Sequence, residues 1–184
     1  MPSKRRLEPA QALRVVTQAL GGRISIPLSA VRHRLAGISE KVELDVAEAP
    51  PGVRVRGQAH ALGAPISFSA RIDASGVEVR GEQRTIRLRL SEVALATEDD
   101  APGPLADAIR NGMIDTANPA TLIGNMISLP DMIVSAEGQD VILDLMKRPA
   151  FQRDELHRAA FAAATSYLCV TGIEVADDAI ELSL

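Results

Sequence analysis

Cysteine and aromatic residues are nearly missing from this chain of 184 residues. The single cysteine, Cys169, excludes an internal disulfide framework and is typical of a reducing compartment. Tryptophan is absent, and three phenylalanines and one tyrosine leave few rings on which bases or sugars could stack. The net charge of −4 includes no long block of one sign, so we do not expect nucleic acid as a partner.

Long hydrophobic runs are missing as well. No stretch reaches the ~20 apolar residues of a membrane-spanning helix. The start, MPSKRR, resembles the basic region of a signal peptide, but Glu8, Gln11, Arg14 and Gln18 interrupt the segment that follows it. We therefore expect a cytoplasmic protein, or a periplasmic one if an export signal has been removed.

The usual constellations of catalytic and metal-binding residues are also missing. His33, His60 and His157 are far apart in the sequence, and none has a second ligand at metal-binding spacing. The acidic run at 98–100 lacks the alternating oxygen ligands and the central glycine of a calcium loop. No Gly-x-Ser-x-Gly, Walker or dinucleotide motif is present. We expect a protein that is not an enzyme and carries neither a metal nor another cofactor.

What the chain does have is a long region, 38–95, in which apolar and polar residues alternate. Successive side chains of a strand point to opposite faces, so this pattern predicts a sheet with one apolar and one polar face. The apolar positions are Val42, Leu44, Val46, Val53, Val55, Ala59, Ile66, Phe68, Ala70, Ile72, Val77, Val79, Ile86, Leu88 and Leu90.

Turn residues divide this region into antiparallel neighbours. The predicted turns are Pro50-Pro51-Gly52, Gly63-Ala64-Pro65 and Asp73-Ala74-Ser75-Gly76. In the last strand, about 83–97, the apolar positions change from even to odd after Leu90. A β-bulge near Ser91-Glu92 would keep both sets on one face.

The other segments predict helices, a hairpin and closing strands within a single α+β domain, 1–184. A strongly curved antiparallel β-meander is expected to pack against the helices. The parts are an N-terminal helical segment 1–22 (helix 8–20, with Leu13, Val16 and Leu20 on one face), the sheet 23–97, an apolar helical insertion 98–130, and a region 131–184 containing a hairpin at 133–143, a helix at 153–168 and two closing strands.

Arginines recur on the polar face of the meander, and two interpretations are open. Arg54, Arg56, Arg71, Arg80, Arg87 and Arg89 could touch anionic lipid head groups in a transient contact with a membrane surface. They could instead pair across strands with Glu43, Asp45, Glu78 and Glu82. Because acids and bases are interleaved, the sequence favours pairing.

The apolar face also allows two interpretations. It can be sealed by helices in an ordinary core, or it can remain partly open as a groove or cavity. The interior candidates are aliphatic residues and methionines, which suit flexible acyl chains and varied apolar shapes.

Two stretches resemble the bacterial branch of the tubular lipid-binding (TULIP) superfamily, of which the LmeA-like phospholipid-binding proteins are an example. They are GVRVRGQAHALGAPISFSARIDASGVEVRG and the closing TGIEVADDAIELSL. The resemblance covers about residues 20–184 and carries no catalytic motif. It implies a strongly bent antiparallel sheet around a long helix, with an apolar channel for lipid tails.

Our prediction is a non-enzymatic binder of a lipid, a fatty-acyl chain or another long apolar ligand. The alternative is a structural or interaction module with a solid core that forms homodimers through its apolar helices. The predicted ligand-binding residues are Ile66, Phe68, Leu88, Leu90 and Val93 on the sheet, Leu122, Ile123 and Met126 as a lid, and Leu105, Ile109 and Met113 behind them.

Overall fold

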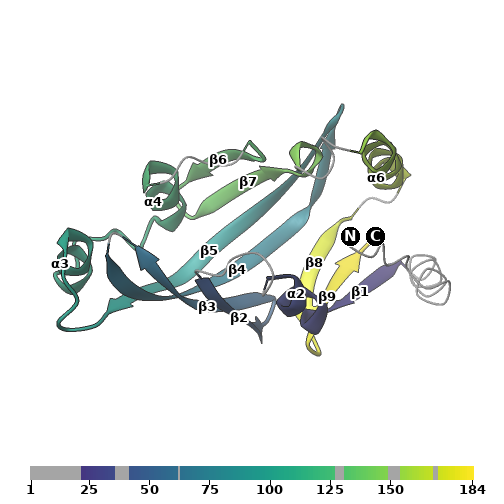
Figure 1. Ribbon diagram of the computed structural model, residues 1–184. Coiled ribbons are helices and arrows are strands. Elements are labelled where there is room, and N and C mark those ends of the chain that lie inside the picture. Colours follow the sequence, from purple (N-terminus) through teal and green to yellow (C-terminus); the bar gives the residue numbers. More distant parts are fainter. Residues whose placement is uncertain (1–21, 36–41, 62, 127–130, 149–153, 168–169) are drawn as a thin grey trace, which may run out of the picture.

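The computed structural model describes residues 22–35, 42–61, 63–126, 131–148, 154–167 and 170–184. Figure 1 labels the helices and strands formed by these residues. In chain order they are β1 (Arg23–Pro27), α2 (Leu28–Leu35), β2 (Val42–Ala49), β3 (Gly52–Ala61), β4 (Ala64–Arg80), β5 (Gln83–Thr97), α3 (Pro104–Arg110), α4 (Pro119–Met126), β6 (Ile133–Glu137), β7 (Asp140–Asp144), a 3-10 turn η1 (Leu145–Lys147), α6 (Glu155–Tyr167), β8 (Gly172–Ala176) and β9 (Ala179–Ser183).

All strand pairs in the described residues are antiparallel. Six strands lie in the order β2-β3-β4-β5-β7-β6, and β1, β9 and β8 form a three-stranded part. One bridge, between Ser75 and Gly172, joins the two parts through β4 and β8. The expected α+β class with an antiparallel sheet is therefore confirmed, and β1 pairs with β9 at the other end of the chain rather than with β2.

The turn predicted at 73–76 is wrong. β4 runs without a break through this segment, and the reversal comes later, between Arg80 and Gln83. The segment instead contains a register shift between Ala74 and Val77, at the point where β8 approaches. A Cβ atom on Gly76 would lie 2.6 Å from the Val170 carbonyl oxygen. The small residues in this segment thus allow β8 to approach β4 closely. A single sequence does not distinguish small residues that serve this purpose from small residues that form a turn.

The bulge predicted near Ser91-Glu92 is confirmed. Ser69 pairs with Ala94 and Arg71 with Ser91, so β5 contains one residue more than β4 at this point. Glu92 has a φ of 50°, as expected for a residue that absorbs the irregularity. Leu90 and Leu95 consequently lie on the same face of β5.

The largest buried side chains lie where the three-stranded part meets β2 and β3. Leu28 (0% exposed), Val46 (2%) and Val175 (4%) form this cluster. Main-chain bonds hold it together, since the Val175 amide donates to the Pro51 carbonyl at 2.8 Å and the Leu28 amide to the Asp178 carbonyl at 2.8 Å. A second cluster, near α3, contains only alanines.

Several helix boundaries differ from the predicted ones. α3 ends at Arg110, and Gly112 follows with a φ of 65°, so Met113 lies beyond the helix instead of on its apolar face. α4 begins at Pro119, within the predicted helical insertion 98–130, because proline is well suited to the first helical turn. The β6–β7 hairpin, α6 and the closing β8–β9 pair are confirmed. The predicted helix 8–20 lies outside the described residues.

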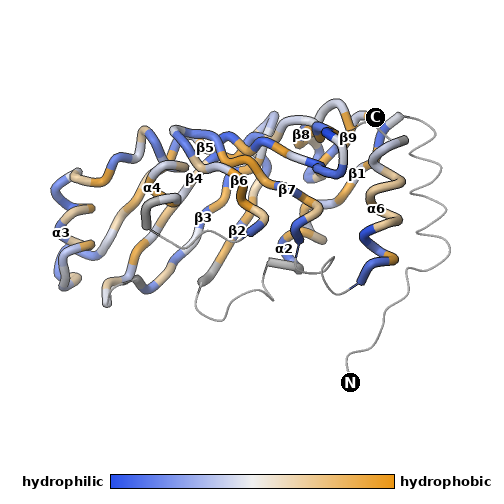
Figure 2. The backbone as a smooth tube through the Cα atoms, turned by 90° about the horizontal axis from the view of Figure 1, so that it is seen from above, coloured by the Kyte–Doolittle hydropathy of each residue, from blue (hydrophilic) through white to orange (hydrophobic). Residues whose placement is uncertain are grey.

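The elements are spread along one axis. Helix α3 lies at one end and α6 near the other in both views (Figures 1 and 2). Most apolar side chains of the described strands are only half-buried.

Candidate functional site

The apolar face of β2–β5 is the first candidate site. Strand register places Phe68 opposite Leu95, Ile72 opposite Leu90 and Ala74 opposite Leu88. Each of these side chains is half-buried. Among the described apolar side chains of β2–β5, only those of Val46 and Ala64 are fully buried. The face is thus a continuous apolar surface that the described elements cover incompletely.

The helices meet the six-stranded part of the sheet mainly near its margins. α2 packs against β2, α3 against β5 and β4, and α4 against β6 and β5. In Figure 1 no labelled helix crosses the middle of the long β4–β5 pair.

The structure brings some of the predicted ligand-binding residues together and separates others. Ile66 and Phe68 on β4 share the apolar face with Leu88, Leu90 and Val93 on β5. Val93 and Ile109 line a hollow of about 290 Å³ between β5 and the chain after α3. Leu105 and Ile109 on α3 are half-buried, as are Leu122 and Ile123 on α4. Met113 is 72% exposed. The side chain of Met126 lies outside the described part.

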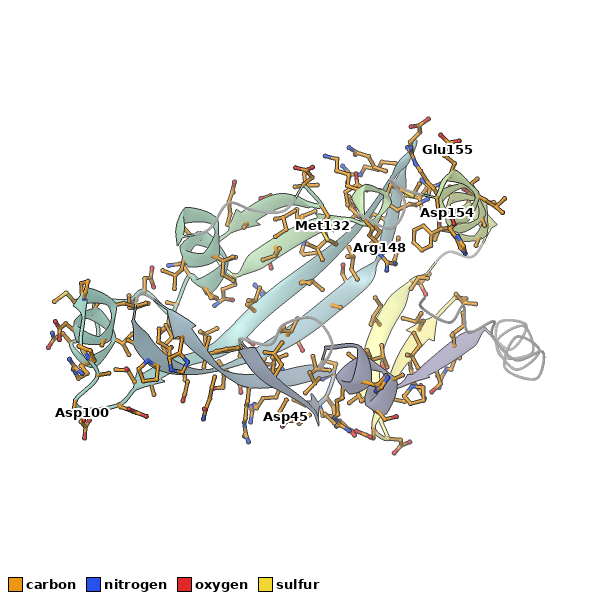
Figure 3. The ribbon with its side chains drawn as sticks, viewed as in Figure 1. Asp45, Asp100, Met132, Arg148, Asp154 and Glu155 are labelled. Atoms are coloured by element: carbon orange, nitrogen blue, oxygen red, sulfur yellow. The ribbon has the colours of Figure 1, made fainter. Side chains whose placement is uncertain are left out.

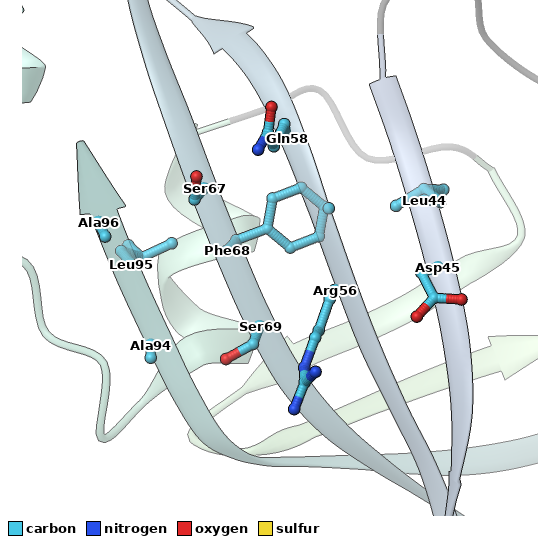
Figure 4. Close-up of a pocket in the computed structure, with 11 residues that line it drawn as sticks. Leu44, Asp45, Arg56, Gln58, Ser67, Phe68, Ser69, Ala94, Leu95 and Ala96 are labelled. Carbon is cyan, nitrogen blue, oxygen red and sulfur yellow. The ribbon is translucent and has the colours of Figure 1, made fainter. Parts of the chain in front are cut away.

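A larger hollow, of about 560 Å³, lies elsewhere, over β2–β5 (Figure 4). Three rows of cross-strand neighbours line this hollow. The two outer rows point to the polar face and contain Asp45, Arg56, Gln58, Ser67, Ser69, Ala94 and Ala96; the row between them contains Leu44, Gly57, Phe68 and Leu95. The next apolar residues along each strand, such as Val55 and Ile66, are not part of the lining. The hollow therefore opens on the polar face.

The hollow exists because side-chain lengths differ across the strands. β4 and β5 contribute serines and alanines, whereas β2 and β3 contribute the longer Asp45, Arg56 and Gln58. The Arg56 side chain has no hydrogen bond or ion pair with another described residue. Sequence reasoning missed this site. A signal was present, because Ser67, Ser69, Ala94 and Ala96 are small residues at positions of the polar face where charged residues are otherwise common.

The other arginines of the polar face are mostly paired. Glu92, at the bulge, bridges Arg54 and Arg71, which lie directly opposite each other on β3 and β4. The remaining pairs are Arg71–Asp73, Arg80–Glu78 and Arg89–Asp140. Charge pairing was the favoured interpretation. The side chain of Glu43 lies outside the described part, and of the other three acids predicted as partners Glu78 alone has an ion pair with a described residue, Arg80 on the same strand.

Arg84 is a buried arginine that joins two elements. Its residue is 4% exposed, at the end of the β4–β5 pair. Nε donates to the Thr165 hydroxyl at 2.8 Å and Nη2 to the Ser166 hydroxyl at 2.8 Å, both on α6. Nη1 donates to the Gly81 carbonyl at 2.7 Å. This side chain therefore fixes the inner face of α6 to the sheet.

Titratable groups give no sign of a catalytic centre in the described residues. The side-chain amide of Asn118 lowers the pKa of Asp115, and the His157 amide lowers the pKa of Asp154. Both carboxylates are at the surface, in local hydrogen bonds at a loop and at the start of α6. The part of the chain that is described contains no group of three residues able to hold a metal ion.

None of the helices in the described segments has the length and hydropathy needed to cross a membrane. Comparisons with protein-family models, curated proteins and solved structures found no match to this chain. The TULIP resemblance thus stays a prediction that rests on the two sequence stretches given for it.

Proposed function

We propose that the protein is a non-enzymatic, TULIP-like binder of a lipid or another long apolar ligand, which lies along the apolar face of β3–β5. The half-buried state of Phe68, Leu88, Leu90 and Leu95 on one continuous face is the observation that supports this proposal most directly. A long chain laid along them would complete their burial, and the sheet would curve around it.

Affinity would come from burial rather than from specific polar contacts. Each methylene removed from water contributes ~0.8 kcal/mol, so an acyl chain of ordinary length would be held firmly even after its ordering cost. Ile123 on α4 and Val93 beside the bulge would extend the contact at the edge of the face. Arg56 and Arg87 have no ion pair with another described residue, and they would permit a transient contact with an anionic membrane surface. The single cysteine, Cys169, supports a cytoplasmic location for this protein.

A second candidate is self-association through apolar helices and edges. Met113, beyond α3, is 72% exposed and Val134, on β6, is 51% exposed. β6 pairs only with β7 in the described residues, so its other edge is open. A homodimer formed there would need no ligand.

Native mass spectrometry of freshly purified protein, followed by organic extraction, separates the two candidates. The first predicts an adduct with the mass of a lipid, and Leu88→Asp and Ile123→Asp should abolish it while the far-ultraviolet circular dichroism stays unchanged. Ser67→Asp is the matched control, since it adds one negative charge on the opposite face of β4 and should retain the adduct. A clean dimer without an adduct, or an adduct retained by both apolar-face variants, would overturn the proposal.

A further inference from the structure

Arg84 lies at the end of the apolar row of β5. β5 pairs with β7 without a register shift from Thr85 to Arg89, so the side chains of Arg84, Ile86, Leu88 and Leu90 point to the same face. At the usual rise of a strand, the row from Arg84 to Leu90 is about 20 Å long. The apolar face therefore ends at a positive charge that is itself buried, since Arg84 is 4% exposed.

The charge of Arg84 has no carboxylate partner among the described residues. Its hydrogen bonds all go to neutral oxygens, namely the hydroxyls of Thr165 and Ser166 and the carbonyls of Gly81, Gln83 and Ala162. These acceptors satisfy the N–H groups, and the negative end of the α6 dipole offsets part of the charge. A buried charge without a counter-ion is still costly, so a nearby negative group would stabilise it.

A hollow of about 430 Å³ lies beside Arg84, between α6, the β4–β5 turn and η1. Ala159 and Ala162 form the α6 side of it, and Met146 belongs to η1. The short alanine side chains leave the space open. Its volume is within the range of sites that bind small molecules.

Three more charged side chains line this hollow. They are Arg158 and Glu155 on α6 and Glu82 in the β4–β5 turn. Glu155 projects from the start of α6, beside that turn (Figure 3). None of the three has an ion pair with another described residue.

The hollow thus contains two guanidinium groups and two carboxylates. A ligand with negative charge alone would be repelled by the carboxylates, and a neutral ligand would leave all four groups without a charged partner. A zwitterionic ligand, with a phosphate beside the arginines and an ammonium beside the glutamates, pairs with both sets.

We propose that this hollow binds the zwitterionic head group of a phospholipid, of the phosphoethanolamine kind, while the tails lie along Ile86, Leu88 and Leu90; the proposal rests on the lipid-binding function and gives the ligand a direction. Arg158 contacts the phosphate, and Arg84, whose N–H groups are already engaged, adds its charge from behind. The head group adds selectivity to an affinity that comes from burial of the tails.

Lipids with identical tails test the head-group assignment. Delipidated full-length protein is incubated with dioleoyl phosphatidylethanolamine, dioleoyl phosphatidylglycerol or dioleoylglycerol, and retained lipid is measured by native mass spectrometry. Phosphatidylethanolamine should bind about tenfold more tightly than the other two, because they lack one or both of the charges that the hollow pairs with. Equal retention of all three, or preference for phosphatidylglycerol, would overturn the head-group assignment alone. Retention of none would overturn the lipid-binding function as well.

Two substitutions separate head-group contact from a structural role. Arg158→Gln should weaken phosphatidylethanolamine binding about tenfold. Arg89→Gln is the matched control, since it removes the same charge from the opposite face of β5, and it should leave binding unchanged. Glu155→Gln should weaken phosphatidylethanolamine and strengthen phosphatidylglycerol, because a repelling carboxylate is removed, whereas a structural role would weaken both. Unaltered preferences in Arg158→Gln and Glu155→Gln, with circular dichroism also unaltered, would overturn the proposal.

The head group without its tails distinguishes a lipid from a free polar ligand. Glycerophosphoethanolamine should compete with the lipid about a thousandfold more weakly or less, because it lacks the buried methylenes. Competition as strong as that of the lipid would assign the hollow to a small polar molecule and overturn the direction proposed for the tails.

Discussion

The apolar face can be distinguished from a sealed core by comparing two leucine-to-alanine variants. Leu28 is fully buried in the cluster with Val46 and Val175, whereas Leu88 is half-buried on the proposed ligand face. Leu28→Ala should lower the free energy of unfolding by about 3 kcal/mol, through lost burial and a residual cavity. Leu88→Ala should cost only about 1 kcal/mol in ligand-free protein, because solvent already reaches the site and no closed cavity forms.

Urea denaturation of delipidated protein, followed by circular dichroism, measures this difference. With an m-value of about 2 kcal/mol/M, the midpoint should fall by about 1.5 M for Leu28→Ala and by about 0.5 M for Leu88→Ala. Added ligand should raise the wild-type midpoint and raise that of Leu88→Ala less, because it binds the folded state alone. Equal losses of about 3 kcal/mol in both variants, with no response to ligand, would refute the open face and favour a solid core.

Three further predictions concern the framework around this face. Gly76→Ala should lower the melting temperature strongly, because the new Cβ atom would lie 2.6 Å from a main-chain oxygen. Gly172→Ala is the control and should be nearly neutral, because its Cβ atom would have its nearest neighbour at 3.7 Å. Equal effects of the two variants in calorimetry would argue against the close crossing. The pKa of Asp154 is lowered in the folded protein by the His157 amide, so its contribution to the start of α6 is complete above the unfolded pKa and is lost as pH falls through the folded pKa. The protection factors of the α6 amides, which are corrected for the pH dependence of intrinsic exchange, should therefore fall on acidification and become less pH-dependent in Asp154→Ala; an unchanged profile would exclude this cap. Glu92→Gln should cost no more than about 1 kcal/mol and only at low salt, since the Glu92 carboxylate is exposed to solvent, and a loss that persists at high salt in urea titrations would contradict a screened pair.

Local pattern in the sequence was enough to predict most of the strands and one irregularity. The alternation in 83–97 predicted a bulge near Glu92 because a change of phase would otherwise move Val93 and Leu95 to the wrong face. The β6–β7 hairpin and α6 also followed from their own residues, since turn chemistry and helical spacing are local properties. The error among the strands, the turn predicted at 73–76, came from the same reasoning, because a glycine such as Gly76 suits both a chain reversal and a close strand crossing.

The candidate site depended on contacts that no local pattern records. Alternation predicted that Phe68, Leu88 and Leu90 share a face, and strand register confirms this. Whether that face is covered depends on where the helices lie, and the 560 Å³ hollow on the polar side depends on short residues of β4 and β5 meeting long ones of β2 and β3.

The sequence by itself therefore determined which residues form strands and helices and which face of each strand is apolar, because period and turn preference act over a few neighbours. Only the tertiary structure decided that β1 pairs with β9, that Arg84 is buried against α6, and that the apolar surface of β3–β5 stays half-exposed. These outcomes depend on pairing between segments as much as 160 residues apart, such as Arg23 and Ser183. Their free energies belong to the whole arrangement, so no single segment encodes them.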